Sequence, residues 1–157
     1  MSFRSNGRRI PQLYERIGGP SVTEKRSCLR MDVLIVEDHG DTAAAMSMAL
    51  RSMGHRTRIA TSIAEALELL LNQKIDLIIS DVGLPDGSGL SFINGVRAFC
   101  DAPAIAVTGF ASSEDAECLM AAGFNKHLPK PFDLPELEAA IRDVASDTSN
   151  GDTQRSK

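Results

Sequence analysis

Residues 76–89, DLIISDVGLPDGSG, combine a short apolar run with an acidic residue and a cluster of turn formers. The run at residues 77–79 leads to Asp81, and the turn formers that follow are Gly83, Pro85, Asp86, Gly87 and Gly89. An apolar run bounded by turn residues is typical of a strand buried on both faces of a parallel sheet. We therefore expect Asp81 at the carboxyl end of a strand, where open α/β sheets bind their ligands.

A second apolar run, residues 33–36, ends in the acidic pair Glu37 and Asp38. If this run is also a strand of the parallel sheet, its two carboxylates and that of Asp81 meet at one edge. Like charges at close range need a cation or a proton between them. The two runs together predict a charged site at this edge.

Strand and helix patterns alternate five times from residue 31 onward. The expected strands are residues 33–36, 55–60, 77–81, 104–107 and 125–128, and the expected helices are residues 41–53, 63–71, 89–99, 112–122 and a last helix capped at Asp133. Apolar residues at helical spacing mark the buried helix faces, which include Ile63, Ala66, Leu67, Leu70 and Leu71 in the second helix and Leu137, Ala140, Ile141 and Val144 in the last. The alternation predicts the α/β class, with a doubly wound five-stranded parallel sheet and right-handed crossovers.

The chain of 157 residues, 43% of them hydrophobic, is long enough for one domain with its own core. We expect a basic, disordered N-terminal extension at residues 1–30, a folded domain at residues 31–145 and a disordered polar tail at residues 146–157. The extension carries seven basic and two acidic residues, whereas the folded domain carries eight basic and seventeen acidic residues. This acidic balance argues against broad nucleic-acid binding by the domain itself.

One part of the extension has an apolar pattern. Ile10, Leu13, Tyr14 and Ile17 fall at helical spacing, although a helix this short is marginal in isolation. The segment is either a solvated tail or a small docking element for a partner or a membrane surface. Elsewhere no apolar run approaches the length of a membrane span, and the three cysteines lack the spacing of a disulfide or metal framework, so we expect a cytoplasmic protein.

The residues at the predicted strand ends suit phosphoryl chemistry. Three carboxylates, those of Glu37, Asp38 and Asp81, would lie beside the hydroxyl of Thr108 and the ammonium of Lys130. Hard oxygen ligands of this kind suit Mg²⁺, which binds through few protein carboxylates. A carboxylate is also a competent nucleophile toward phosphorus, and a metal with an ammonium group would balance charge on the transferring group.

These motifs resemble the receiver domains of response regulators in two-component signalling, in particular the chemotaxis-regulator-like stand-alone receivers. The resemblance covers residues 31–145 and includes the acid pair, the pattern Asp-x-x-Leu-Pro-x-x-x-Gly from Asp81 to Gly89, Thr108-Gly109 and Lys130-Pro131. It implies a flavodoxin-like (βα)5 fold with strand order 2-1-3-4-5. It further implies that Asp81 accepts the phosphoryl group, that Glu37, Asp38, Asp81 and the Gly83 carbonyl hold Mg²⁺, and that Lys130 and Thr108 contact the phosphoryl group.

One position departs from the common receiver pattern. Where many receivers carry Tyr or Phe three residues before the lysine, this chain has His127, so the switch that the resemblance implies would pair Thr108 with an imidazole. The resemblance also implies that Phe110, two residues after Thr108, and Gly83, two residues after Asp81, gate the water that hydrolyses the aspartyl phosphate. His39 and His55 are interpreted as surface residues.

The resemblance predicts a phosphoacceptor module rather than an enzyme, phosphorylated by a sensor histidine kinase or a histidine phosphotransfer protein. Its output would pass through the surface formed by residues 112–122, residues 125–128 and the last helix, which could also form a homodimer. The alternative is a Mg²⁺-dependent phosphohydrolase or phosphotransferase with an aspartyl nucleophile, but haloacid-dehalogenase-like enzymes need a second Asp where this chain has Gly83. A third interpretation, a DNA-binding regulator that uses the basic extension, would require salt-dependent DNA binding.

Overall fold

The computed structural model describes residues 30–109 and 113–151. A five-stranded parallel sheet forms its centre, in the order β2-β1-β3-β6-β7. The strands are β1 (Asp32–Val36), β2 (Arg56–Ala60), β3 (Leu77–Asp81), β6 (Ala104–Thr108) and β7 (Lys126–Pro129). This confirms the predicted α/β class and the strand order 2-1-3-4-5.

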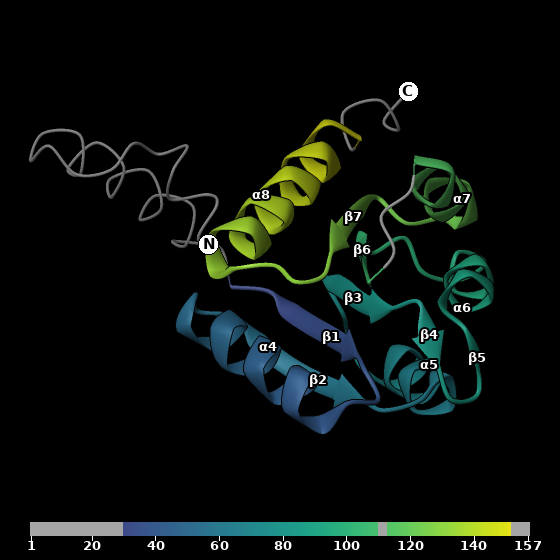
Figure 1. Ribbon diagram of the computed structural model, residues 1–157, viewed down its shortest axis with the longest axis horizontal. Helices are drawn as coiled ribbons and strands as arrows, with labels where there is room; N and C mark the ends of the chain where they lie inside the picture. Colours follow the sequence, from purple (N-terminus) through teal and green to yellow (C-terminus); the bar gives the residue numbers. More distant parts are fainter. Residues whose placement is uncertain (1–29, 110–112, 152–157) are drawn as a thin grey trace, which may run out of the picture.

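Five helices cover the two faces of the sheet (Figure 1). They are α4 (Gly40–Ser52), α5 (Ile63–Asn72), α6 (Gly89–Val96), α7 (Ser113–Ala122) and α8 (Leu134–Gly151). Helices α4 and α8 lie on one face, and α5, α6 and α7 lie on the other. The fold is therefore a three-layer sandwich with its sheet buried on both sides.

The core consists of one apolar cluster on each face of the sheet. Alternate residues of β1 supply both clusters, since Val33 and Ile35 pack toward α4 and α8 while Leu34 and Val36 pack toward α5 and α6. Successive strand side chains point to opposite faces, so a strand covered on both sides must be apolar throughout. This explains why the central strands read as unbroken apolar runs.

Two predicted helix features differ from the structure. The sequence pattern predicts a buried Leu71, but this side chain is 70% exposed. The buried face of α5 centres on Ala66, and Leu71 projects about 100° around the helix from Leu70, beyond the edge of that face. Helix α6 ends at Val96 rather than at residue 99, because residues 97–99 form a turn closed by hydrogen bonds back to the helix.

The structure also contains elements beyond the predicted ones. Helix α8 continues to Gly151, past the boundary at residue 145 expected between domain and tail. A two-stranded antiparallel hairpin, β4 (Gly83–Leu84) and β5 (Gly87–Ser88), stands in the loop after β3. The expectations for residues 1–29 and 152–157 lie outside the described residues.

Candidate functional site

Asp81 is the last residue of β3 and lies at the carboxyl edge of the sheet. Its Oδ1 accepts hydrogen bonds from the backbone N–H of Val82 at 2.7 Å and of Gly83 at 3.4 Å. Oδ2 remains directed toward Lys130, whose Nζ lies 3.5 Å away. One carboxylate oxygen is therefore held by the backbone, and the other faces the centre of the site.

The hairpin folds tightly back against Asp81. The Gly89 N–H donates to Val82 O at 2.7 Å, and a Cβ placed on Gly89 would come within 2.6 Å of the Asp81 carbonyl oxygen. Only glycine permits this approach. The glycine that ends the loop motif thus has a physical role, since it lets α6 begin directly beside Asp81.

Glu37 follows β1 and is completely buried. Its Oε2 lies 3.1 Å from Lys130 Nζ, and its Oε1 accepts a hydrogen bond from the backbone N–H of His39 at 3.2 Å. A buried carboxylate is costly unless it is paired and hydrogen-bonded. Lys130 provides that pairing, so the ammonium group bridges Glu37 and Asp81.

The charge of Lys130 is reinforced by its neighbours. Burial alone would lower the pKa of Lys130, but the hydrogen bond from its ammonium group to Glu37 and the charges of Asp81 and Glu37 outweigh this effect. The pKa therefore lies above its ordinary value of 10.5. Lys130 is therefore a positive charge held between the carboxylates of Glu37 and Asp81.

Asp38 and His39 complete the acidic edge. Oδ1 of Asp38 lies 3.4 Å from Nδ1 of His39, which is also 3.3 Å from Oε1 of Glu37. Each of these three residues offers one possible ligand atom, and the three atoms all lie within 4.8 Å of one another. The carboxylate oxygens of Glu37 and Asp38 suit a hard cation such as Mg²⁺, whereas imidazole nitrogen does not.

Only two of the predicted metal ligands lie in one cluster of possible ligand atoms. Glu37 and Asp38 share one cluster, while Asp81 reaches Glu37 through their common contact with Lys130. The backbone of Gly83 lies next to Asp81, to which its N–H donates. The donor set fits a cation bound on the Asp38 side of the site, with the ammonium of Lys130 on the opposite side.

Thr108 ends β6 and Lys130 directly follows β7, the neighbouring strand, as predicted. Thr108 is 6% exposed, and its carbonyl oxygen accepts a hydrogen bond from the Lys130 N–H at 2.7 Å. This backbone bond continues the pairing of β6 with β7 beyond Pro129 and fixes where the Lys130 side chain starts. Phe110, the predicted water gate, lies outside the described residues.

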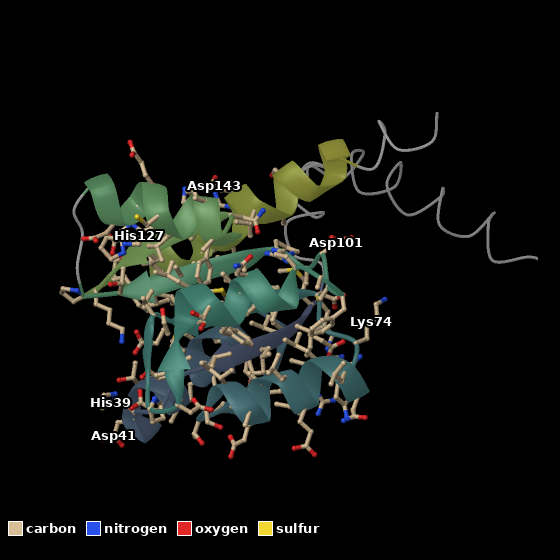
Figure 2. All side chains as sticks on the ribbon, turned by 90° about the vertical axis from the view of Figure 1, so that its right-hand side faces the viewer. His39, Asp41, Lys74, Asp101, His127 and Asp143 are labelled. Carbon is tan, nitrogen blue, oxygen red and sulfur yellow. The ribbon has the colours of Figure 1, made fainter. Side chains whose placement is uncertain are left out.

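The two sheet edges differ in their charged residues (Figure 2). His39 and Asp41 lie at the carboxyl edge, whereas Lys74 and Asp101 lie at the opposite edge. His39 is exposed, as we predicted, but its contacts with Glu37 and Asp38 make it part of the site, which the sequence reasoning missed. The available signal was its position directly after the acid pair.

Known proteins identify this arrangement. The sequence model of the response regulator receiver domain family matches residues 33–142 of this chain. The chain belongs to this family. It is 37% identical over 111 residues to an uncharacterized 14.6 kDa protein from the sodA1 3' region of Leptolyngbya boryana, a match that covers 69% of this chain and 85% of that protein.

A second relative has a longer chain. The KDP operon transcriptional regulatory protein KdpE of Escherichia coli strain K12 is 36% identical over 111 residues, which cover 71% of this chain and 49% of KdpE. This receiver domain therefore spans about half the length of that relative. Among solved structures, chemotaxis protein CheY4 of Vibrio cholerae has a TM-score of 0.69 and 29% identity, with 74% of this chain and 99% of that chain covered.

Two histidines of the receiver domain have unexpected environments. His127 pairs with Ala106 across β7 and β6, and its Nε2 is buried without a hydrogen-bond partner among the described residues. The prediction that His55 lies on the surface was wrong, since it is 6% exposed and its Nδ1 accepts a hydrogen bond from the Met31 N–H at 3.2 Å. Burial lowers the pKa of His55, because the charged imidazolium is desolvated there.

Within residues 30–109 and 113–151, every helix is too short or too polar to span a bilayer.

Proposed function

We propose that this receiver domain accepts a phosphoryl group on Asp81 from a phosphohistidine. The donor would be a sensor histidine kinase or a histidine phosphotransfer protein. One observation carries the proposal, namely the position of Asp81 Oδ2 at the end of β3, 3.5 Å from the ammonium of Lys130. A carboxylate placed next to a fixed positive charge can attack phosphorus while the charge of the transferring group is stabilised.

The chemical step uses the residues in distinct roles. An Asp81 oxygen would form the new O–P bond as the P–N bond to the donor imidazole breaks, and the electron pair of that bond would stay with the imidazole nitrogen. Lys130 and the hydroxyl of Thr108 would contact phosphoryl oxygens. Mg²⁺, held by Glu37, Asp38, Asp81 and the Gly83 carbonyl, would supply further positive charge to those oxygens.

We propose that the same groups also assist the phosphorylation and dephosphorylation of Asp81 within the same chain. Receiver domains are signalling modules, and the proposed assistance of phosphorylation and dephosphorylation concerns only this chain's own Asp81. The phosphohydrolase alternative gains no support, because Gly83 offers no carboxylate two residues after the nucleophile. Residues 31–145 would form the cytoplasmic receiver unit, with residues 1–30 as a basic extension and residues 146–157 as a polar tail.

The proposed output surface is formed by α7, β7 and α8, and it could also mediate a homodimer. Phosphorylation replaces the single negative charge of the Asp81 carboxylate with a phosphoryl group that carries up to two, and its oxygens would attract Thr108 and Lys130. His127 lies on β7 between the site and this surface, so its movement with Thr108 would carry the change outward. A partner is regulated only if it binds the two forms with different affinity.

Phosphorylation by a small donor tests the assignment of Asp81. The full chain is incubated with acetyl phosphate and Mg²⁺, and intact mass spectrometry records the addition of one phosphoryl group. Asp81→Asn should abolish the addition, while Asp86→Asn, which removes a carboxylate from the same loop, should retain it. Full incorporation in Asp81→Asn would show that another residue is the acceptor.

A further inference from the structure

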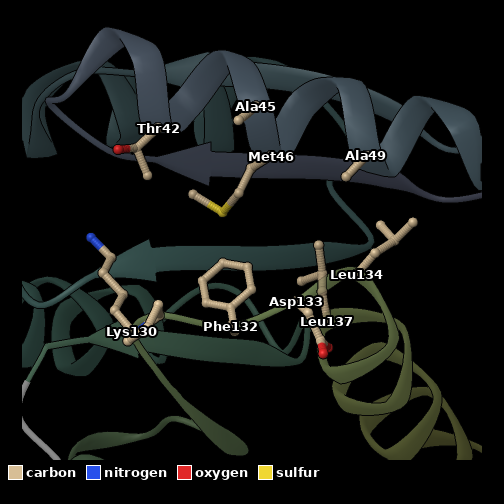
Figure 3. Close-up of a pocket in the computed structure, with 10 residues that line it drawn as sticks. Thr42, Ala45, Met46, Ala49, Lys130, Phe132, Asp133, Leu134 and Leu137 are labelled. Atoms are coloured by element: carbon tan, nitrogen blue, oxygen red, sulfur yellow. The ribbon is translucent and has the colours of Figure 1, made fainter.

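An apolar cavity of about 590 Å³ lies between α4 and the start of α8 (Figure 3). Met46 and Phe132 face each other across it, with Thr42 and Lys130 at one end and Ala49 and Leu134 at the other. Its lining is mostly apolar, and one of the apolar lining residues, Leu134, is 47% exposed. The cavity thus leaves apolar surface accessible beside the site residue Lys130.

The cavity continues toward the point where the chain enters the domain. A second cavity of about 330 Å³ shares Leu134 with the first, and Met53, His55 and Ile141 are among its lining residues. His55 accepts the hydrogen bond from the N–H of Met31, so the described part of the chain begins beside this cavity. We call the two cavities together the α4/α8 seam; it runs from Lys130 to His55.

We propose that residues 10–17 of the same chain dock in the α4/α8 seam as a short helix, with Ile10, Leu13, Tyr14 and Ile17 facing the seam. The helical spacing of these apolar residues is a pattern that the proposed function leaves unused. Eight helical residues are about 12 Å long, and the part of α4 that contributes to the first cavity, from Thr42 to Ala49, is also eight residues long. The segment therefore matches the cavity in length.

The connection and the charges favour this occupant. Residues 18–29 can extend over about 40 Å, whereas the 13-residue helix α4 is about 20 Å long, so the segment can reach the whole seam. The tether provides an effective concentration in the millimolar range, which compensates for the weak stability of so short a helix. Residues 1–30 carry a net charge of +5 (7 − 2), opposite to the −9 (8 − 17) of residues 31–145.

Disulfide trapping tests the docking in the full chain. Cys28, Cys100 and Cys118 are first replaced by Ser, and Ile17→Cys is combined with Ala49→Cys, which lies at the end of the first cavity nearer to the linker. The matched control combines Ile17→Cys with Met48→Cys, because Met48 is the preceding residue of α4 and is 72% exposed. Docking predicts that the intramolecular disulfide forms about tenfold faster in the variant with Ala49→Cys than in the variant with Met48→Cys.

A third variant separates docking from random encounter. Adding Leu13→Asp to the Ile17→Cys and Ala49→Cys pair should remove the excess rate, since it places a charge on the docking face while leaving the domain unchanged. Circular dichroism of each reduced protein verifies that the domain is folded. Equal rates for the two cysteine pairs would overturn the proposal, as would disulfides that form mainly between molecules and accelerate with protein concentration, which would assign the seam to a second copy.

Discussion

At the acidic edge of the sheet, the ammonium group of Lys130 pairs with two of the three carboxylates. Lys130 contacts Glu37 at 3.1 Å and Asp81 at 3.5 Å, whereas Asp38 is paired only with the exposed imidazole of His39 among the described contacts. The Asp38 carboxylate adds negative charge beside the buried Glu37, which already shares Lys130 with Asp81. The site without a cation is therefore a local cost to stability that a cation can relieve.

Asp38→Asn should stabilise the domain in the absence of divalent cations. Removal of one negative charge should raise the free energy of unfolding by about 1 kcal/mol in excess chelator. The same substitution should shrink the rise in melting temperature that Mg²⁺ causes in the wild type, because a proposed ligand is lost. Thermal unfolding with and without Mg²⁺ measures both effects, and Asp41→Asn, outside the contacts with Lys130, is the control. An unchanged Mg²⁺ response would remove Asp38 from the metal site.

His127 offers a second test at the scale of one side chain. A buried nitrogen without a hydrogen-bond partner lowers stability, so His127→Phe should raise the free energy of unfolding by about 1 kcal/mol. His55→Phe is the matched control, because it deletes the acceptor of the Met31 N–H and should lower stability by about 1–2 kcal/mol. Urea unfolding compares the two variants. A loss of stability in His127→Phe would indicate that Nε2 has a partner.

Among the secondary-structure elements, the β4–β5 hairpin connects the loop after Asp81 to α5. Asp86, between the two strands, accepts hydrogen bonds from the N–H groups of Ile63 at 2.9 Å and Ala64 at 3.1 Å. Ser62 caps the same helix through the N–H of Glu65. A helix N-terminus has unpaired N–H groups and favours negative charge, so the hairpin supplies an N-terminal cap from a distant part of the sequence.

The cap formed by Asp86 should make stability depend on pH. The hydrogen bond from the Ile63 N–H lowers the pKa of Asp86 below its ordinary value of 3.8. A depressed folded-state pKa means that the stabilisation is present above about pH 4 and is lost as pH falls through the folded-state pKa. Asp86→Asn should therefore lower the melting temperature at pH 7, and the difference from wild type should narrow at pH 3.

Glu68→Gln provides the comparison for this prediction. Glu68 is an exposed acid of the same helix, and its carboxylate makes no hydrogen bond or ion pair with the described residues. The substitution removes the same charge without removing a cap, so its effect on the melting temperature should be smaller at pH 7. If both variants behave alike, general charge rather than capping explains the effect of Asp86.

At the scale of the whole molecule, the two candidate interaction surfaces flank the acidic site. The α4/α8 seam reaches Lys130 from one side, and the α7, β7 and α8 surface lies on the other side of β7. If residues 10–17 dock in the seam, they cover the α4 side of the acidic site. A large phosphodonor that approaches Asp81 there would then compete with the docked segment.

Leu13→Asp should accelerate phosphorylation of the full chain by a phosphohistidine-bearing protein by about threefold to tenfold, because it frees the competent, undocked form. The rate with acetyl phosphate should be unchanged, since a small donor needs no protein surface. This prediction rests on both the docking and the proposed function. Gln12→Asp, which adds the same single negative charge off the apolar face, is the control for the added charge.

The two donors distinguish the ways in which this prediction could fail. Absence of phosphorylation with either donor would contradict the function proposed for Asp81. Normal rates with acetyl phosphate and equal rates of wild type and Leu13→Asp with the protein donor would instead show that the segment does not obstruct the donor.

The sequence by itself determined which residues meet at the site. Asp81, Glu37 and Thr108 each follow an apolar run and Lys130 follows a short predicted strand, and parallel strands bring their carboxyl ends to one edge whatever their order. Local patterns also located the helices, because burial of one face imposes a spacing that a single segment displays. The order of the strands came from the resemblance to receiver domains, since periodicity contains no information about neighbours.

Only the tertiary structure decided which groups touch. Lys130 meets Glu37 across 93 positions of sequence, and the burial of His55 and the exposure of Leu71 depend on how their segments pack against the rest of the domain. The capping of α5 by Asp86 likewise joins residues whose separate patterns do not predict a contact. A residue's own segment fixes its element and face, but its partners are set by the packing of distant elements, which a local pattern cannot encode.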